Sequence, residues 1–128
     1  MSYKHNGATH FNPKFTLGET WLMDVLIQDV DGTVVDLTGT AGARWRMADD
    51  TAVLIDVNLG SGIEWNSDPK TGILHIRIEP NLQNGVLPTE PHKYYRHELR
   101  LTDNPVVGTS TQMIGRVAVL DSLFRKFP

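Results

Sequence analysis

The stretch Thr20-Trp-Leu-Met-Asp-Val-Leu-Ile-Gln-Asp-Val30 alternates apolar and polar side chains with a period of two. Successive side chains of an extended segment point to opposite faces, so its apolar members share one face. That inward set is Trp21, Met23, Val25 and Ile27. The dipeptide Asp31-Gly32 follows directly, and glycine tolerates the positive φ of a tight hairpin turn. The stretch therefore predicts a β-strand with one buried face, followed by a hairpin.

Short runs with the same alternation occur along the rest of the chain, separated by Gly, Pro, Asp and Asn. Further strands are expected at 33–37, 43–47, 52–59, 63–65, 73–78, 94–102 and 111–120. No segment offers the long amphipathic helical pattern that a βαβ crossover needs. About seven to nine short strands of this kind predict an all-β, antiparallel, immunoglobulin-like β-sandwich. A small β-barrel stays open as an alternative, because the alternation is common to both architectures.

The 128 residues fit one compact domain with flanking segments. Residues 1–14, with their polar, Gly and Pro content, are expected to form a flexible N-terminal arm. The sandwich is expected to span 15–120, and 121–128 to form a C-terminal tail. Apolar side chains beyond a last strand fold back on their own domain or dock on a neighbour. The candidate partner contacts in this tail are Leu123, Phe124 and Phe127.

The composition excludes several classes of function. The chain carries 12 basic and 15 acidic residues, a net charge of −3. This balance argues against nucleic-acid and anionic-membrane binding, because clustered Lys and Arg carry such binding. No apolar run approaches the roughly 20 residues that span a bilayer. The absence of cysteine excludes a disulfide scaffold, a thiol nucleophile and a cysteine-based zinc site.

The candidate catalytic side chains have simpler structural explanations. The alternation places His97 inside and His75 outside, which predicts a hydrogen-bonded histidine at the edge of the core and a solvated one. An enzyme that uses His97 with Glu98 is the weakest alternative, since adjacent strand residues point to opposite faces. Nothing in the sequence places Asp24 and Glu19 around a cleft as a carboxylate pair. We therefore expect no catalytic residue.

Three aspartates invite a calcium site. Asp29, Asp31 and Asp36 lie at spacings that are similar to part of a calcium loop. However, Gly32 follows the second aspartate directly, as a hairpin requires, whereas an EF-hand loop needs three ligands before its glycine and a later glutamate. The spacing favours turns, and we expect neither a metal nor a cofactor.

Two surface features remain as binding candidates. Trp65 lies in a short strand between turns and is a candidate contact with a glycan or a protein partner, whereas Trp21 and Trp45 lie at inward positions. Arginines on the outward faces of separate strands are expected to alternate with acidic residues, which predicts a face of mixed charge. The residues of this face are Arg44, Arg46, Arg77, Arg96 and Arg100, with Glu64 and Glu98.

Short motifs occur along the chain in a fixed order. The first half contains Gly18-Glu-Thr-Trp21, Asp29-Val-Asp-Gly32, Val35-Asp-Leu-Thr-Gly39 and Ala43-Arg-Trp-Arg-Met-Ala48. The second half contains Gly72-Ile-Leu-His-Ile-Arg-Ile78, Leu87-Pro88, Tyr95-Arg-His-Glu-Leu-Arg-Leu101 and Gly115-Arg-Val-Ala-Val119. This order resembles small β-sandwich proteins of tailed bacteriophages and prophages, including the N-terminal domains of baseplate upper-type proteins. The chain departs from the family pattern at His97 and Glu98, where Tyr and Asp are usual, and in the polar insert at 89–92.

The resemblance implies a non-enzymatic structural component of a phage or prophage tail or baseplate that acts through protein–protein assembly. It implies other tail or baseplate proteins as partners, a homo-oligomer, and a place in the virion, or in the cytoplasm of the bacterial host before assembly. The N-terminal arm and the C-terminal tail would become ordered on assembly. The alternative is a carbohydrate-binding β-sandwich module that recognises a receptor or glycan through Trp65 and the loop after it.

Overall fold

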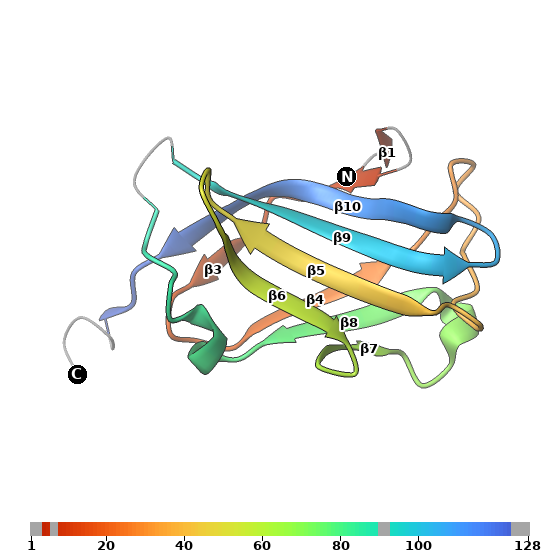
Figure 1. Ribbon diagram of the computed structural model, residues 1–128, viewed down its shortest axis with the longest axis horizontal. Coiled ribbons are helices and arrows are strands. Elements are labelled where there is room, and N and C mark those ends of the chain that lie inside the picture. Colours follow the sequence, from red (N-terminus) through yellow and green to blue (C-terminus); the bar gives the residue numbers. More distant parts are fainter. Residues whose placement is uncertain (1–3, 6–7, 90–92, 124–128) are drawn as a thin grey trace.

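The computed structural model describes residues 4–5, 8–89 and 93–123, and its long elements are all β-strands (Figure 1). In chain order the strands are β1 (Lys4–His5), β2 (Ala8–His10), β3 (Lys14–Thr16), β4 (Trp21–Leu26), β5 (Gly42–Ala48), β6 (Val53–Leu59), β7 (Gly62–Trp65), β8 (Ile73–Ile78), β9 (Tyr95–Asn104) and β10 (Gly108–Leu120). Two short 3₁₀ helices, η1 (Pro69–Thr71) and η2 (Pro80–Gln83), lie in the connections. Among the described residues, no helix has the length and apolar character needed to cross a membrane.

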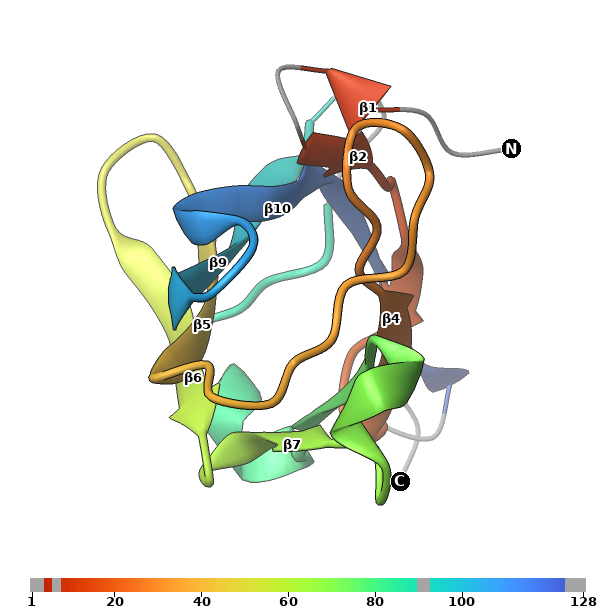
Figure 2. The ribbon, with the colours of Figure 1, turned by 90° about the vertical axis from the view of Figure 1, so that its right-hand side faces the viewer.

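The strands form two layers that enclose the core (Figure 2). The front sheet has the order β10-β9-β5-β6, and its neighbouring strands are antiparallel. The back sheet has the order β4-β8-β7 and is also antiparallel. A short parallel contact between β6 and β7 joins the layers along one side. On the other side β4 ends the pairing path, so the described strands do not close into the barrel that the sequence left open.

The strand order identifies the type of sandwich. If β4 to β10 are lettered B, C, C′, D, E, F and G in chain order, the two sheets read G-F-C-C′ and D-E-B. These are the sheets of an immunoglobulin sandwich whose GFC sheet is extended by C′. The predicted antiparallel, immunoglobulin-like β-sandwich is therefore confirmed.

Two other features of immunoglobulin domains occur in altered form. Trp45 on β5 is fully buried, like the core tryptophan of strand C. The Tyr95 hydroxyl, at the start of β9, lies 3.0 Å from both the backbone N–H and the carbonyl oxygen of Leu87, as in a tyrosine corner. His97 follows two residues later, where antibody domains have a disulfide cysteine. It accepts a hydrogen bond from Trp45 instead.

Burial follows the alternation that the sequence predicts. The inward side chains of β4 and of Ile27 after it are 1–8% exposed, and the inward side chains of β5 are fully buried. Removing each large apolar side chain from water contributes about 1.5–3 kcal/mol to folding. Phe15 of β3 stacks on Trp21 with 4.7 Å between ring centroids, so a strand paired with the front sheet also packs on the back sheet.

The hairpin predicted after β4 is confirmed as a turn, but the pair of strands that we expected around it does not form. Gly32 has φ of 88° and its N–H donates to the Asp29 carbonyl oxygen. The returning segment 33–37, which we expected to be a strand, makes only one isolated bridge. The N–H of Val35 donates to Ile27, whereas that of Leu37 donates to Pro69, so successive donors find partners in different segments and no ladder forms.

The first residues are paired with the body of the domain. Within the range 1–14, expected to be an arm, β2 lies parallel to β10, and β3 begins at Lys14 and lies parallel to the end of the same strand. Each of these two strands has only three residues, too few for an alternating pattern to stand out in the sequence. A side chain at Gly115 would overlap the carbonyl oxygen of Phe11, so glycine permits this close approach.

Candidate functional site

Alternation places a set of charged side chains on the outer face of the front sheet. We call this surface the arginine face: Arg44 and Arg46 of β5, Arg96 and Arg100 of β9, and Arg116 of β10, with Asp56 of β6 and Glu98 of β9 among them. The predicted mixed charge is confirmed, but Arg77 and Glu64, which we expected on the same face, lie on the back sheet. Asp50, in the turn after β5, lies 3.9 Å from Arg96, so five arginines lie against three carboxylates and the excess is two positive charges on a chain whose net charge is −3.

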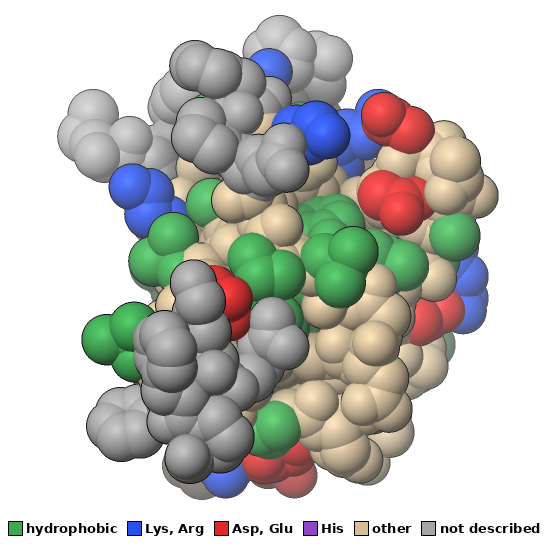
Figure 3. All heavy atoms as spheres, turned by 90° about the vertical axis from the view of Figure 1, so that its left-hand side faces the viewer, with side chains coloured by type: hydrophobic (Ala, Val, Ile, Leu, Met, Phe, Trp, Pro, Cys, Tyr) green, Lys and Arg blue, Asp and Glu red, His purple; other side chains and the backbone are tan. Residues whose placement is uncertain are grey.

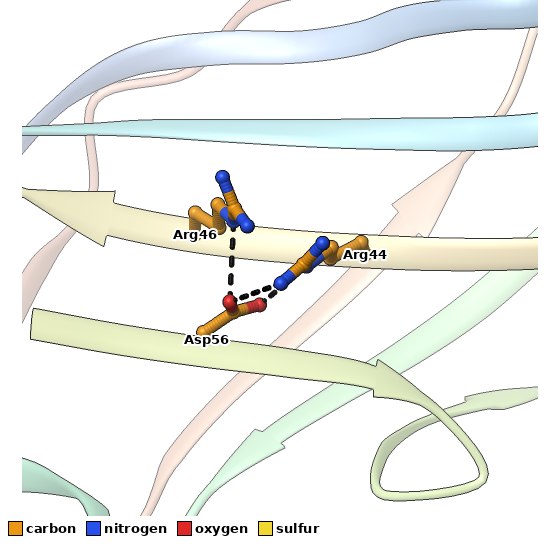
Figure 4. Close-up of polar contacts among 3 residues, drawn as sticks. All are labelled: Arg44, Arg46 and Asp56. Carbon is orange, nitrogen blue, oxygen red and sulfur yellow. Dashed lines mark hydrogen bonds and ion pairs between the residues drawn. The ribbon is translucent and has the colours of Figure 1, made fainter. Parts of the chain in front are cut away.

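One carboxylate binds two of these arginines (Figure 4). Arg44 donates from Nε and Nη2 to the two oxygens of Asp56 at 2.7 and 2.6 Å, and Arg46 donates from Nε at 3.2 Å. The hydrogen bond from Arg44 is the main cause that lowers the pKa of Asp56 below 3.8. All three side chains remain partly exposed, so solvent screens the interaction and its contribution to stability is small.

The register sets two pairs of arginines directly opposite each other. Arg44 faces Arg100 across β5 and β9, and Arg96 faces Arg116 across β9 and β10. Like charges in such positions destabilise a sheet. Each has another contact; Arg100, for example, lies 3.6 Å from Glu98, and Arg116 lies over the Tyr94 ring at 5.4 Å. The fold thus keeps an unfavourable arrangement of charge on its front sheet.

The outer face of the back sheet carries a shallow groove of about 520 Å³. We call it the acidic groove; its charged and apolar side chains are Leu22, Asp24, Glu64, His75, Arg77, Glu79 and Leu82. Three carboxylates therefore face one guanidinium and one imidazole. Arg77 donates to Glu79, which lowers the pKa of that carboxyl group below 4.5. Leu22 is 63% exposed and supplies an apolar wall.

His75 ends a chain of hydrogen bonds whose directions are fixed. Thr71 donates to the carbonyl oxygen of Asp68 and accepts from the amide nitrogen of Asn66 at 3.2 Å. The Asn66 oxygen therefore faces Nε2 of His75, at 3.1 Å, while Nδ1 lies 2.6 Å from Asp24. Each ring nitrogen therefore lies beside a side-chain oxygen. The predicted solvated histidine is thus a link between β4 and the loop that contains η1.

The groove contains the residue types of a hydrolytic triad without its geometry. Ser61 lines the same groove as His75 and Asp24. A triad base must leave Nε2 free to take the proton of the serine hydroxyl. Here Nε2 faces the Asn66 amide at 3.1 Å rather than a serine hydroxyl, so the triad geometry is absent. Nothing in the sequence joins Asp24 with His75, since neither lies in a catalytic motif and 51 residues separate them.

His97, the inward histidine, is buried as predicted. Its Nδ1 accepts from Trp45 Nε1 at 3.1 Å, and its Nε2 donates to the Phe11 carbonyl oxygen at 2.7 Å. Tryptophan can only donate, so the ring is neutral and protonated on Nε2. Burial lowers the pKa of His97 below 6.5. Glu98 points to the other face, where Thr111 donates to it, so the two do not cooperate.

The aspartates considered as calcium ligands form turns. Asp31 accepts from the N–H of Thr33 at 3.0 Å, and Asp36 accepts from that of Thr38 at 2.9 Å. Hydrogen bonds from these threonines lower the pKa of both carboxyl groups below 3.8. In the described part of the chain, no three His, Asp or Glu side chains gather where they could hold a metal ion.

The candidate contact residues lie apart from one another. Trp65 pairs with the fully buried Leu74 and packs against the core, so its ring is only partly exposed. Leu123 is 73% exposed after the end of β10. Figure 3 shows hydrophobic side chains on the end of the molecule from which the C-terminal segment leaves. Phe124 and Phe127 lie outside the described residues.

Comparison with known proteins adds likenesses of shape alone. No family model and no curated protein matches this sequence. A structure of VGSC beta subunits, described for multimeric cell-adhesive interactions, is 13% identical with a TM-score of 0.49, and the match covers 88% of this chain and 93% of that one. A chicken TCR structure is 8% identical with a TM-score of 0.47, over 87% of this chain and 53% of that one. This chain thus spans about half of the TCR chain, and the strand order itself carries the fold assignment.

Proposed function

We propose that this chain is a non-enzymatic structural component of a phage or prophage tail or baseplate, and that it acts through protein–protein assembly. The observation that carries the proposal is the arginine face. The tail or baseplate setting rests on the resemblance of the ordered motifs, from Gly18-Glu-Thr-Trp21 to Gly115-Arg-Val-Ala-Val119.

The arginine face has the properties of a protein-binding surface. It is formed by four paired strands, so its side chains are held on a rigid frame. Arginine is enriched in protein interfaces and binds carboxylates through two parallel hydrogen bonds. The opposed pair Arg96 and Arg116 costs stability in the isolated domain, and an acidic partner surface would offset that cost.

The groove supports the absence of catalysis. Both ring nitrogens of its one histidine are held by Asp24 and Asn66, so neither is directed at Ser61. In this proposal the chain is located in the virion, or in the cytoplasm of the bacterial host before assembly, and functions as a homo-oligomer with other tail or baseplate proteins. Leu123, Phe124, Phe127 and Trp65 remain the candidate contacts outside the arginine face.

Affinity capture tests the proposal. Tagged wild-type chain, the variant Arg96→Glu and the control Lys70→Glu are each incubated with lysate of the host after prophage induction. Lys70 is exposed on η1, away from the arginine face, so its reversal changes the net charge equally. Tail or baseplate proteins should accompany the wild type and the control and be depleted at least about tenfold with Arg96→Glu, a loss of about 1.4 kcal/mol in binding.

Folding and binding must be separated in this experiment. Arg96→Glu removes one of two opposed arginines, so the free energy of unfolding should stay equal or rise by a few tenths of a kcal/mol. A stable variant that still captures the same proteins would show that the arginine face is not the contact. Recovery of no particle protein by the wild type, from a lysate shown to contain particles, would overturn the proposed function.

A further inference from the structure

We infer that the arginine face of one copy docks on the acidic groove of a second copy, so that the chain associates with itself front to back. The inference rests on the proposed function, because it names one partner of the proposed assembly surface. The two surfaces are the outer faces of opposite sheets, so a copy in such a contact still has one surface of each kind available.

Charge is the first reason for this pairing. The arginine face has two positive charges in excess when Asp50 beside Arg96 is included, whereas the groove sets the carboxylates of Asp24, Glu64 and Glu79 against Arg77 and His75. Two arginine faces would repel each other, and so would two grooves. A symmetric dimer through either face is therefore disfavoured, while contact between unlike faces is attractive.

Shape is the second reason. Arginine side chains project from the front sheet around a hollow lined by Arg46, Arg96 and Arg116, and the acidic groove presents exposed leucines at Leu22 and Leu82. An arginine that enters it can lay its aliphatic stem on the leucines and direct its guanidinium to Glu64. Glu64 is exposed and lies opposite His75 across β7 and β8, so its carboxylate is accessible in the groove.

The geometry has a consequence for assembly. A contact between two different surfaces is heterologous, and it generates a ring if the rotation between copies closes and an open stack if it does not. Cyclic rings of more than two copies are built from contacts of this kind. The proposed surface thus supplies the homo-oligomer with a direction, front to back, that a two-fold dimer lacks.

Sedimentation velocity on the full chain tests the inference. Wild type is studied from about 1 µM to about 1 mM, the range in which weak contacts dissociate. Two neutralised variants are compared with it: Arg96→Gln/Arg100→Gln on the arginine face and Leu22→Ser/Glu64→Gln in the groove. Lys70→Gln is the control. Wild type and control should associate, and the association should weaken about tenfold or more as salt is raised from 0.02 to 0.5 M.

Mixing the variants gives the sharpest result. Each variant alone should stay monomeric, because one of its two surfaces is lost. An equimolar mixture should form a 1:1 dimer and nothing larger, since the intact face of one variant meets the intact groove of the other. Folding of each variant is checked by its far-UV circular dichroism. All the substituted side chains are exposed, so the core is unchanged.

Other outcomes would overturn the inference. The inference fails if the wild type stays monomeric at every concentration, if the groove variant still associates with itself, or if the mixture remains monomeric. It also fails if the monomeric chain binds a DNA duplex in a gel-shift experiment and Arg96 is required for that binding. Capture of particle proteins by a monomeric wild type would leave the proposed function standing. Self-association without any captured particle protein would do the reverse, so the two failures are distinguishable.

Discussion

The two described histidines with partners on both ring nitrogens lie on opposite sides of their sheets. His97, inside the front sheet, has one donor and one acceptor as partners. His75, outside the back sheet, has two acceptors. The first environment holds a neutral ring, whereas the second places an oxygen beside each ring nitrogen, although both residues belong to strands with the same alternation. The contacts of His97 are buried and stabilise the fold, whereas those of His75 are exposed to solvent and shape the surface of the groove.

The largest expected difference between the two sides concerns packing. Trp45→Ala should lower the free energy of unfolding by about 3–5 kcal/mol, because it empties a fully buried site and removes the donor to His97. Leu22→Ala, on the outer side, should change it by less than about 0.5 kcal/mol. Urea denaturation of both variants measures the contrast. Similar losses in the two variants would show that the inner and outer sides contribute alike.

The next effect concerns the partner of the inner histidine. Gly115→Ala forces a side chain against the Phe11 carbonyl oxygen and should cost about 1–3 kcal/mol. Amide exchange should quicken at Phe11, whose N–H donates to Ile114. Gly85→Ala is the control, since its new side chain would meet only the end of Leu54 at an ordinary distance. Unchanged exchange at Phe11 in Gly115→Ala would show that the N-terminal segment is held elsewhere.

Much of the inner side could be predicted from the sequence. Alternation gives the facing of a residue without knowledge of its partner strand, so the burial of Trp21, Trp45 and His97 followed from local pattern alone. Segment 33–37 failed because its donors are satisfied by two different segments, which alternation does not encode. One feature of the sequence indicates the pairing of β2 and β3 with β10. Gly115 lies inside a strand pattern, where a glycine indicates the close approach of another backbone segment.

The sequence predicts which residues lie on the outer surfaces, but not which of them come together to form a site. The sequence placed Asp24 and His75 outside, yet their contact depends on β4 lying beside β8, a long-range choice among strands of similar pattern. The same holds for the arginine face. Which arginines lie opposite each other is set by register across three strands, and a shift of one residue would change every neighbour.

A smaller effect separates the two histidines by pH. Because burial lowers the pKa of His97 below 6.5, the unfolded chain takes up a proton at higher pH than the folded one. The contribution of His97 is therefore complete above about pH 6.5 and is lost as pH falls toward the folded pKa, with a slope of at most about 1.4 kcal/mol per pH unit. Urea unfolding between pH 7.5 and 5 should show this loss in wild type.

Matched variants assign the pH effect. His97→Gln can still accept from Trp45 and donate to Phe11 but does not titrate, so it should flatten the decline below pH 6.5. His75→Gln should leave the decline in place, since the inner ring is untouched. A decline that survives in His97→Gln would place its origin in another group.

The smallest expected effect on stability concerns the ion pair of Arg44 with Asp56 on the arginine face. Its hydrogen bonds are short, but both side chains are partly exposed to solvent. A double-mutant cycle of Arg44→Ala and Asp56→Ala should give a coupling of about 0.2–1 kcal/mol, falling with added salt. Arg46 also donates to Asp56, so the carboxylate keeps one arginine partner when Arg44 is removed, and this reduces the coupling further. A coupling near that of the buried Trp45–His97 contact would mean that the outer side stabilises the fold. A small one supports the view that these charges are kept for a partner rather than for the domain itself.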